Sequence, residues 1–439
     1  MVNPHLPRAD SPKGISRRKF LTEAGLLTGG LLIGQTFPTN SAGAQTPFGG
    51  TATVPALGAQ QQPKNPLLLA HYMPWYQTPA VSGYWGWHWT MDHFKPTQKD
   101  DRGRPQIASH YLPRTGPYDS SDPTVLEYQT LLMKLSGIDG VIVDWYGISS
   151  FRDYGVLHKA TLALFEAIRK AGLIFAVCYE DNTVKEMVKN GYLNADDARQ
   201  HGQEVVRFMD QHWFPDPHYL KVEGQPLVFT FGPQYFKSAS DWESMFSVAT
   251  PTPALITLDG HLVAGALGTY PWPPMKGIDL NQAAVEAYLK QFYRKARWNQ
   301  YRVGGAFPGF HDIYQQAGIR DSYGYLDPQE GEIFRVTLQM ALEQNPDVIQ
   351  LITWNDYGEG TIIEPTEEFG TRYLKLVQES KRSLDPSGFS YRAEDLELPL
   401  EIYGRRLKQN DSTKAALDHA VEAILQGDLD TARRRLSGG

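Results

Sequence analysis

Two carboxylic acids lie three positions apart in the stretch TWNDYGEG, residues 353–360, which follows the apolar run DVIQLI. This pattern predicts that a strand gives way to a loop, with Asp356 and Glu359 placed among aromatic side chains and glycines. Paired carboxyl groups cleave glycosidic bonds when one donates a proton to the leaving oxygen and the other acts as base or nucleophile. Apolar walls and a neighbouring carboxylate separate the two pKa values, and therefore the two roles. The alternative for this pair is a solvated acidic turn.

Polar and aromatic side chains also follow most of the other apolar runs of the chain. Sugar rings present apolar faces that stack on Trp and Tyr side chains, and their hydroxyl groups form hydrogen bonds. The residues that we expect to contact a sugar at these positions are His71, Tyr72, Trp75, Tyr76, His88, Asp144, Trp145, Tyr146, Tyr179, Glu180, Trp272, His311, Trp354, Asn355 and Tyr357. We expect His71 and His88 to donate hydrogen bonds to sugar hydroxyls. Asp144 either binds a hydroxyl or caps its loop, and the same alternatives hold for Glu180 and Asp181.

The spacing of the histidines gives no indication of a metal or a cofactor. His71, His88, His110 and His311 do not form an HExxH or a comparable pattern, so we expect neither a metal site nor a cofactor. Cys178 is the only cysteine and lies inside an apolar run, where we expect a small core residue rather than a nucleophile. The chain also has no G-x-S-x-G turn, which argues against an esterase.

The composition is that of a globular protein with an acidic balance. Of the 439 residues, 41% are apolar and 12% aromatic, and the net charge at pH 7 is −7. Removal of residues 1–44 takes away five basic and two acidic side chains, which brings the net charge to about −10. Such a surface repels phosphate backbones, and the sequence has no basic stripe, so we expect no nucleic-acid partner.

The elements that must position these side chains are short apolar runs separated by amphipathic stretches. The runs cover residues 67–73, 140–147, 174–181, 226–232, 254–260, 265–272, 303–310 and 348–356. Near-continuous apolar strands separated by helices require a parallel sheet that is buried on both faces. Eight such runs favour a closed (β/α)8 TIM barrel, an α/β fold, over an open doubly wound sheet, and no GxGxxG or P-loop follows the first run. We place this barrel at residues 66–383, with a missing or displaced helix after residue 260.

The segments that flank the barrel predict export and a small appendage. Residues 1–44 combine paired arginines, a short apolar stretch and small residues, which is typical of a twin-arginine-type signal peptide that carries folded proteins. The alternative is a retained amphipathic anchor, because the stretch is too short and glycine-rich for a stable membrane span. Residues 45–65 predict a flexible linker, and residues 384–439 a C-terminal extension with a helical hairpin. We therefore expect a bacterial protein that is periplasmic or secreted, with the twin-arginine translocase as its partner during export.

The stretch TWNDYGEG resembles the signature of glycoside hydrolase families 71 and 99. Family 71 α-1,3-glucanases have a very similar Trp-Asn-Asp-Tyr-Gly-Glu run, and family 99 endo-α-mannosidases and endo-α-mannanases have Trp-Asn-Glu-Trp-His-Glu. AHYMPWY followed by GYWGWHW resembles the family 99 opening, and its Trp-rich loop adds Trp85 and Trp89 to the expected sugar contacts. GPYDSSDP and GIDGVIVDWYG resemble bacterial proteins of the 71/99 type, so the resemblance extends over most of residues 66–383.

The resemblance implies a (β/α)8 barrel that acts on an α-linked polysaccharide or oligosaccharide. In family 99 the first acid of the pair deprotonates the substrate 2-hydroxyl, which attacks the anomeric carbon to give a 1,2-anhydro sugar, and the second acid protonates the leaving group. On that pattern Asp356 is the base and Glu359 the acid/base, and Glu364 matches a Glu-Pro that supports the cleft floor. Asp in place of Glu, and Tyr357-Gly358 in place of Trp-His, are departures that lean toward family 71.

The sequence therefore predicts an exported glycoside hydrolase that cleaves α-linked glycans of α-mannan or α-glucan type. One alternative is a catalytically silent carbohydrate-binding barrel that keeps the cleft. Another is a barrel enzyme of different chemistry, such as a polysaccharide lyase.

Overall fold

A nearly closed parallel barrel forms the centre of the computed structural model, which describes residues 65–408 and 411–437. The predicted signal peptide, and the predicted linker except for its last residue, lie outside the described residues. Within the described part, the eight parallel strands are β1 Leu67–Tyr72, β2 Gly140–Trp145, β3 Ile174–Tyr179, β5 Gln225–Thr230, β6 Ala254–Leu258, β7 Gly268–Tyr270, β8 Val303–Ala306 and β11 Val348–Leu351. Their order is β7-β6-β5-β3-β2-β1-β11-β8, which confirms the predicted TIM-like α/β fold.

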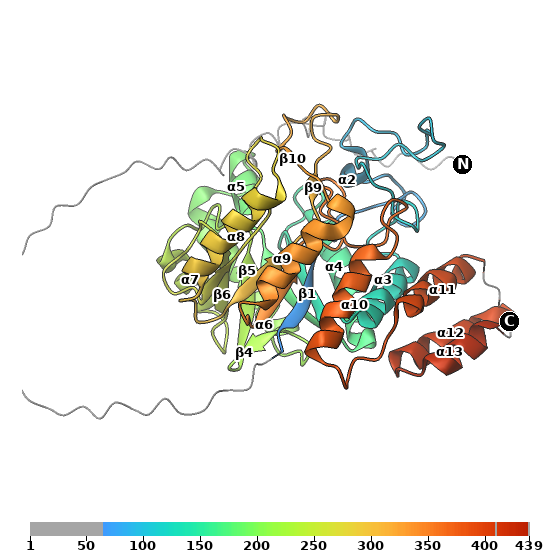
Figure 1. The fold of residues 1–439 in the computed structure, drawn as a ribbon. Helices are drawn as coiled ribbons and strands as arrows, with labels where there is room; N and C mark the ends of the chain where they lie inside the picture. The colour runs from blue at the N-terminus through green and yellow to red at the C-terminus, as the bar shows by residue number, and fades with distance from the viewer. Residues whose placement is uncertain (1–64, 409–410, 438–439) are drawn as a thin grey trace, which may run out of the picture.

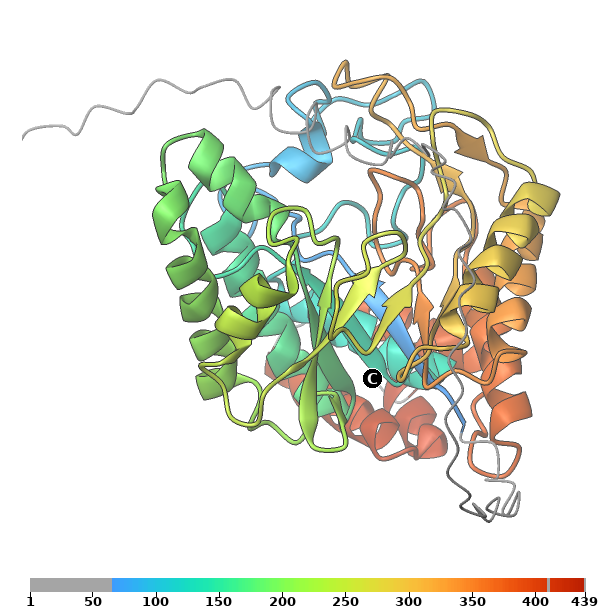
Figure 2. The ribbon, with the colours of Figure 1, turned by 90° about the vertical axis from the view of Figure 1, so that its left-hand side faces the viewer.

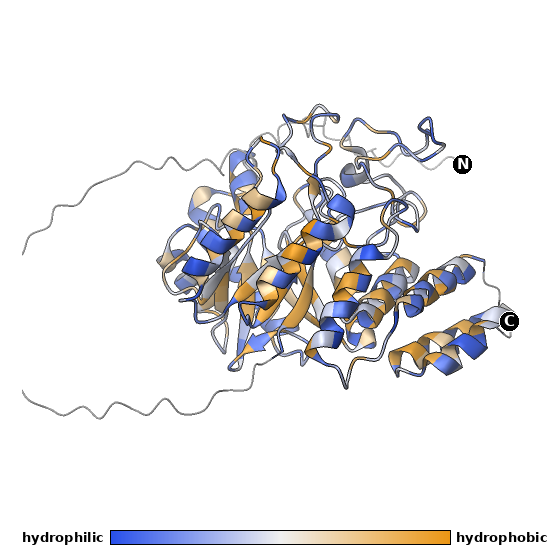
Figure 3. Ribbon diagram, viewed as in Figure 1, coloured by the Kyte–Doolittle hydropathy of each residue, from blue (hydrophilic) through white to orange (hydrophobic). Residues whose placement is uncertain are grey.

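Helices surround the strands on the outside (Figures 1 and 2). They are α3 Pro123–Ser136, α4 Tyr154–Ala171, α5 Asn182–Lys189, α6 Ala198–His212, α7 Ala239–Phe246, α8 Gln282–Ala296, α9 Glu332–Leu342 and α10 Arg372–Leu384. Helix α4 shows why they pack this way, since Leu157, Ala160, Leu164 and Ile168 recur at helical spacing and are all buried. The central strands are largely hydrophobic, whereas the helices combine hydrophobic and hydrophilic residues (Figure 3). No helix lies between β6 and β7, in agreement with the missing or displaced helix that the sequence indicated.

The barrel has a seam between β7 and β8. Within residues 65–408 and 411–437, no strand ladder joins these two neighbours. The carbonyl oxygen of Leu267, just before β7, instead accepts hydrogen bonds from the backbone N–H groups of Gln300 (2.9 Å) and Tyr301 (3.1 Å), just before β8. Two hydrogen bonds at the amino ends of the strands therefore replace a ladder at this position.

Long loops cover the carboxyl ends of the strands. They carry the short helix α2 Trp87–Thr90 and the two-stranded ribbon of β9 Phe310–His311 and β10 Tyr325–Leu326, all at the top of Figure 1. The ribbon β4 Lys221–Val222 lies near the opposite end of the barrel. Chemistry in parallel barrels takes place at the carboxyl ends, and the long loops lie at that face.

The eighth strand is shorter than the sequence suggested. We predicted a strand through residue 356, but β11 ends at Leu351. The backbone N–H of Thr353 donates to Thr361 O at 2.5 Å, and that of Glu364 donates to Trp354 O at 3.0 Å. Thr353 and Trp354 thus use their backbone groups to close a loop, so the whole motif TWNDYGEG lies beyond the strand.

The C-terminal part is a small group of helices beside the barrel, shown in red in Figure 1. It contains η3 Ala393–Glu397, α11 Leu398–Arg406, α12 Asp411–Leu425 and α13 Leu429–Ser437. Arg406 forms ion pairs with Glu127 of α3 (2.9 Å) and Asp418 of α12 (2.6 Å), which joins these helices to the barrel. Among the described helices, none combines the length and the apolar character needed to cross a membrane.

Candidate active site

The two carboxylic acids of the motif lie on one compact turn after β11. The Asp356 backbone N–H donates to Thr353 Oγ1 at 2.7 Å, and the Glu359 N–H donates to Asp356 Oδ1 at 3.1 Å. Gly360 has a φ of +67°, and a Cβ atom there would come within 2.8 Å of the His311 carbonyl oxygen. The turn therefore requires glycine at this position, where an ordinary side chain would be both strained and obstructed.

The electrostatic surroundings of the two acids differ. Burial raises the pKa of Asp356 to about 7, although the backbone N–H groups of Glu359 and Gly358 donate to its carboxylate and favour the ionised form. Burial, together with the neighbouring Asp356 and Asp312 carboxylates, raises the pKa of Glu359 well above its usual range. The Tyr314 hydroxyl donates to Glu359 Oε1 at a long 3.4 Å, so it opposes this shift weakly. At neutral pH, Glu359 therefore holds its proton more firmly than Asp356 does.

Both carboxyl groups open into a cavity of about 140 Å³ at the carboxyl ends of the strands. Of the residues that the sequence analysis selected, the cavity is lined by His71, Trp75, His88, Asp144, Tyr146, Glu180, Trp272, Asp356 and Glu359. These side chains come from loops and strand ends far apart in the sequence. The fold thus brings seven of the eighteen expected sugar-contacting residues together around the two catalytic candidates.

The walls of the cavity are aromatic. Trp75 and His88 stack with ring centroids 4.2 Å apart and planes 8° from parallel, and Tyr146 lies beside Trp75 at 6.3 Å. Trp272 meets His71 edge to face at 5.0 Å. Flat rings around acidic groups provide both an apolar face and hydrogen-bonding partners for a sugar ring.

The other selected residues lie outside the cavity lining. These are Tyr72, Tyr76, Trp85, Trp89, Trp145, Tyr179, His311, Trp354, Asn355, Tyr357 and Glu364. Alternation along the strands explains several of them, because successive side chains point to opposite faces. His71 points into the barrel, whereas the hydroxyl of its neighbour Tyr72 donates to Gln129 on helix α3 at 2.7 Å. Likewise Trp145 donates through Nε1 to His158 on α4, while Asp144 lines the cavity.

Glu364 lies behind the cavity as the centre of a hydrogen-bond network. Its Oε2 accepts from the hydroxyl groups of Tyr118 and Tyr357, each at 2.9 Å, and its Oε1 accepts from Gln129 Nε2 at 2.7 Å. Burial raises the pKa of Glu364 to about 7, although these three hydrogen bonds act to lower it. The network fixes the loop that carries the catalytic candidates.

Asn355 fixes the position of the loop after β1 relative to Asp356 and Glu359. Its side-chain oxygen accepts from the Met73 backbone N–H at 2.8 Å, and its Nδ2 donates to the Met73 carbonyl at 3.0 Å. The Tyr76 hydroxyl donates to the Asn355 carbonyl at 2.9 Å and accepts from the Tyr357 N–H at 3.1 Å. The loop after β1, which supplies Trp75 to the cavity, is therefore tied on both sides of Asp356.

The acids at the ends of β2 and β3 differ in their partners. Asp144 is only 5% exposed, and its Oδ1 has no hydrogen-bond partner among the described residues. Burial raises the pKa of Glu180 to about 8, and the Asp181 carboxylate adds to this effect while a hydrogen bond from Tyr146 opposes it. Asp181 accepts from the backbone N–H groups of residues 234–236 at 2.7–2.8 Å. Asp181 therefore holds the loop after β5 in place. Asp144 and Glu180 instead line the cavity.

One wall of the cavity was not predicted from the sequence. It consists of Tyr314, Arg320 and Tyr323, from the long loop between β9 and β10. Asp312 shapes this loop, because its Oδ2 accepts from the Tyr323 N–H at 2.6 Å and its Oδ1 from the Tyr314 N–H at 3.3 Å. The other lining residues not selected from the sequence are Met73, Trp87, Met91, Asn182, Phe231, Gln234 and Gly358. The available signal was the run of Tyr and charged residues in 312–325, which does not follow a predicted strand directly.

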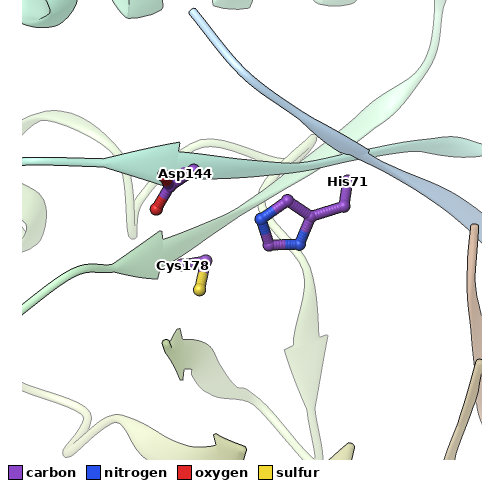
Figure 4. Close-up of side chains that lie close together, drawn as sticks. All are labelled: His71, Asp144 and Cys178. Atoms are coloured by element: carbon purple, nitrogen blue, oxygen red, sulfur yellow. The ribbon is translucent and has the colours of Figure 1, made fainter. Parts of the chain in front are cut away.

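Three side chains that can act as metal ligands lie close together near the carboxyl ends of their strands. They are His71, Asp144 and Cys178 (Figure 4). They come from β1, β2 and β3, and their ligand atoms lie within 4.8 Å of one another. Sequence spacing was no guide to this cluster, because each ligand comes from a different strand.

Comparisons with known proteins agree with this fold. No protein-family model matches the chain. The chain is 24% identical to the mouse protein glycoprotein endo-alpha-1,2-mannosidase over 346 residues, which cover 71% of each chain. It is 23% identical to the human glycoprotein endo-alpha-1,2-mannosidase-like protein over 328 residues, which cover 68% of each chain.

A solved structure has the same fold. The GH99 endo-alpha-mannosidase from Bacteroides thetaiotaomicron superimposes with a TM-score of 0.55 at 19% identity, over 73% of this chain and 98% of that one. A second solved structure, a glycoside hydrolase-like protein, superimposes with a TM-score of 0.50 at 12% identity, over 75% of this chain and 96% of that one. The chain is therefore similar, at 23–24% identity, to glycoprotein endo-alpha-1,2-mannosidases, and it shares the fold of a solved GH99 endo-alpha-mannosidase.

Proposed function

We propose that this protein hydrolyses α-linked glycans of α-mannan or α-glucan type, with Asp356 and Glu359 as its catalytic residues. The observation that carries the proposal is the pair of carboxyl groups on one turn, Asp356 buried and Glu359 partly buried, facing an aromatic-walled cavity at the carboxyl end of a parallel barrel. Distant homology to endo-alpha-1,2-mannosidases supports α-mannosides as the first substrates to test.

The difference between the two carboxyl environments supports a division of roles. Glu359, whose proton is held more firmly, acts as the general acid at the leaving oxygen, and Asp356 acts as the base. In the first step Asp356 takes the proton of the substrate 2-hydroxyl, and the 2-oxygen attacks the anomeric carbon as the leaving group departs with the proton of Glu359. In the second step water opens the 1,2-anhydro ring: Glu359 takes the proton of the water, and Asp356 returns a proton to the 2-oxygen.

The walls of the cavity hold the sugar for this reaction. Trp75, stacked on His88, offers a rigid apolar platform for one face of a ring. The Asp144 Oδ1, without a protein partner among the described residues, is available to a sugar hydroxyl. Burial lowers the pKa of His71 to about 3, so its ring is neutral at working pH and can donate one hydrogen bond and accept another.

A screen of α-mannans, α-glucans and bacterial exopolysaccharides for new reducing ends tests the function. The double variant Asp356→Asn/Glu359→Gln is the control, because it keeps the shape of the site and removes both reacting groups. We expect reducing ends from the wild type alone. Equal binding of a glycan by both proteins without any cleavage would identify a silent carbohydrate-binding barrel. An unsaturated product would identify a lyase.

We also propose that the protein is exported in the folded state to the periplasm or the medium. The paired residues Arg17 and Arg18 ahead of an apolar stretch support this proposal. Replacement of both arginines by lysine is expected to leave an uncut precursor in the cytoplasm of a bacterial host. Normal processing of that variant would instead assign the signal to the general secretory route.

A further inference from the structure

We propose that His71, Asp144 and Cys178 bind a divalent transition-metal ion of the zinc class at the floor of the cavity. The three side chains lie close together on adjacent parallel strands, with their ligand atoms within 4.8 Å of one another (Figure 4). The pairing of β2 with β3 places Asp144 directly opposite Cys178, and β1 adds His71 beside them. A thiolate, an imidazole and a carboxylate are the three kinds of side-chain ligand that zinc takes from proteins.

The polar atoms of this cluster lack the partners that buried groups ordinarily have. His71 is 1% exposed, and neither of its ring nitrogens forms a hydrogen bond of good geometry among the described residues, although the Gln350 side chain lies beside the ring. Asp144 Oδ1 is likewise buried without a partner, and within the described part of the chain the Cys178 sulfur contacts only the Tyr270 hydroxyl, at 3.6 Å. Buried polar groups are almost always satisfied, and each orphaned group costs about 1–3 kcal/mol. Two orphaned groups and a thiol with one long contact, all around one space, indicate a ligand that the three side chains bind together.

The dimensions suit a metal ion with a small contraction of the site. Since the ligand atoms lie within 4.8 Å of one another, an ion at their centre is at most about 2.8 Å from each atom, against about 2.0–2.3 Å in zinc sites. Each side chain must therefore move inward by roughly half an ångström or slightly more, which a rotamer adjustment supplies. As the metal–sulfur bond forms, the Cys178 thiol releases its proton to solvent.

The charge of the surroundings favours a cation. Asp144 faces the carboxyl groups of Glu180 and Asp356, both of which repel a further negative charge on it. His71 faces the neutral side chain of Gln350. A dication bonded to one thiolate and one carboxylate is neutral as a unit, so it places no net charge in the buried floor. His71 and Asp144 also line the cavity, so a fourth coordination position opens toward bound water or a sugar hydroxyl.

Cobalt substitution tests the site independently of turnover. The probe is Co²⁺ added to the full-length protein, purified without a polyhistidine tag and stripped with a chelator. We expect one equivalent to bind with an intense thiolate-to-cobalt charge-transfer band, and Zn²⁺ to abolish this band by displacement. The band has only one possible source, because Cys178 is the only cysteine of the chain.

Variants separate this site from adventitious binding. Cys178→Ser should remove the band and weaken Zn²⁺ binding, measured by calorimetry, about 100-fold. Asp144→Asn should weaken Zn²⁺ binding by a similar factor while the thiol is intact, which covers the case of a Cys178 variant that fails to fold. His311→Ala is the matched control, since His311 stacks on His110 at 3.5 Å on another part of the face. Absence of the band from the wild type, or binding that only His311→Ala reduces, would overturn the proposal.

Discussion

Glu364 and the pair Asp356 and Glu359 lie on the same loop, and all three carboxyl groups have pKa values raised by burial. They differ in their partners. Glu364 accepts hydrogen bonds from three side chains at 2.7–2.9 Å. Glu359 has one side-chain donor, the Tyr314 hydroxyl, at 3.4 Å, and it opens into the cavity.

The comparison separates two uses of a buried acid. A carboxyl group with three donors contributes to stability, because it satisfies the tyrosine hydroxyls that would otherwise be buried alone. A carboxyl group that faces a cavity and accepts few hydrogen bonds lowers the stability of the protein without substrate. Groups that lower stability in this way concentrate at functional sites. Burial and a raised pKa alone do not distinguish the two, whereas the hydrogen-bond partners do.

The largest effect is expected from Asp356→Asn. If Asp356 removes the proton of the 2-hydroxyl, this variant should lose about 10⁴-fold in kcat/KM, even on substrates with activated leaving groups. The step that this variant lacks is the attack of the 2-oxygen on the anomeric carbon, and not the departure of the leaving group. NMR of the first-formed anomer should show retention for the wild type, and substrates with the 2-hydroxyl replaced by hydrogen should resist cleavage. An inverted product together with turnover of the 2-deoxy substrate would assign Asp356 to direct activation of water.

Glu359→Gln is expected to reduce kcat by about 10²–10⁴-fold with unchanged folding. The amide keeps the volume of the side chain and lacks the acidic proton, so a good leaving group should restore part of the rate. Kinetics on a natural glycan and on an aryl glycoside, with circular dichroism as the folding control, give the measurement. Near-native activity on the glycan would remove Glu359 from the role of acid.

Glu364→Ala is expected to act on stability. The variant leaves the hydroxyls of Tyr118 and Tyr357 and the amide of Gln129 buried without their acceptor, which should lower the free energy of unfolding by about 3 kcal/mol or more. Urea denaturation measures the change, and Glu359→Gln is the matched control that should show no comparable loss. Equal losses in both variants would break the distinction between the two kinds of acid.

The smallest expected effect is a pH-dependent increase in the free energy of unfolding caused by Glu180→Gln. Burial raises the pKa of Glu180 from 4.5 to about 8, so the folded state binds the proton more tightly and the contribution of this group to stability falls as pH rises through that window. The amide does not titrate, and its stabilisation relative to the wild type should be at least about 1 kcal/mol larger at pH 8 than at pH 5. Urea denaturation at both pH values measures it, with Glu204→Gln on the exposed side of α6 as the control. A constant difference across this window would contradict the assignment.

The sequence was informative about the barrel because its strands are buried on both faces. All eight apolar runs overlap an observed strand, including the two around residue 260 that lack an intervening helix. The end of the eighth run could not be placed, since Thr353 and Trp354 continue the apolar run with residue types that are common in strands. Only the contacts of Thr353 and Trp354 with residues 361–364 show that the chain has already turned.

The candidate site was predictable in part. Adjacent residues at strand ends were selected together, although the period of two along a strand sends Tyr72, Trp145 and Tyr179 outward when their neighbours point inward. The loop that carries Tyr314, Arg320 and Tyr323 was not predictable in this way, because its path depends on the hydrogen bonds of Asp312. Tertiary contacts of this kind leave no periodic signal in a sequence.

The seam between β7 and β8 gives the barrel a preferred place to open. Two backbone hydrogen bonds to Leu267 connect β7 and β8 in place of a strand ladder. Separating these two strands therefore breaks fewer hydrogen bonds than separating two parallel strands of the barrel that are joined by a ladder. In native-state hydrogen–deuterium exchange, the amides of β7 and β8 should therefore exchange through local fluctuations, while those of β1 and β2 require global unfolding. Trp272 follows β7 and lines the cavity, so local opening of this edge is expected to increase the mobility of one cavity wall as well.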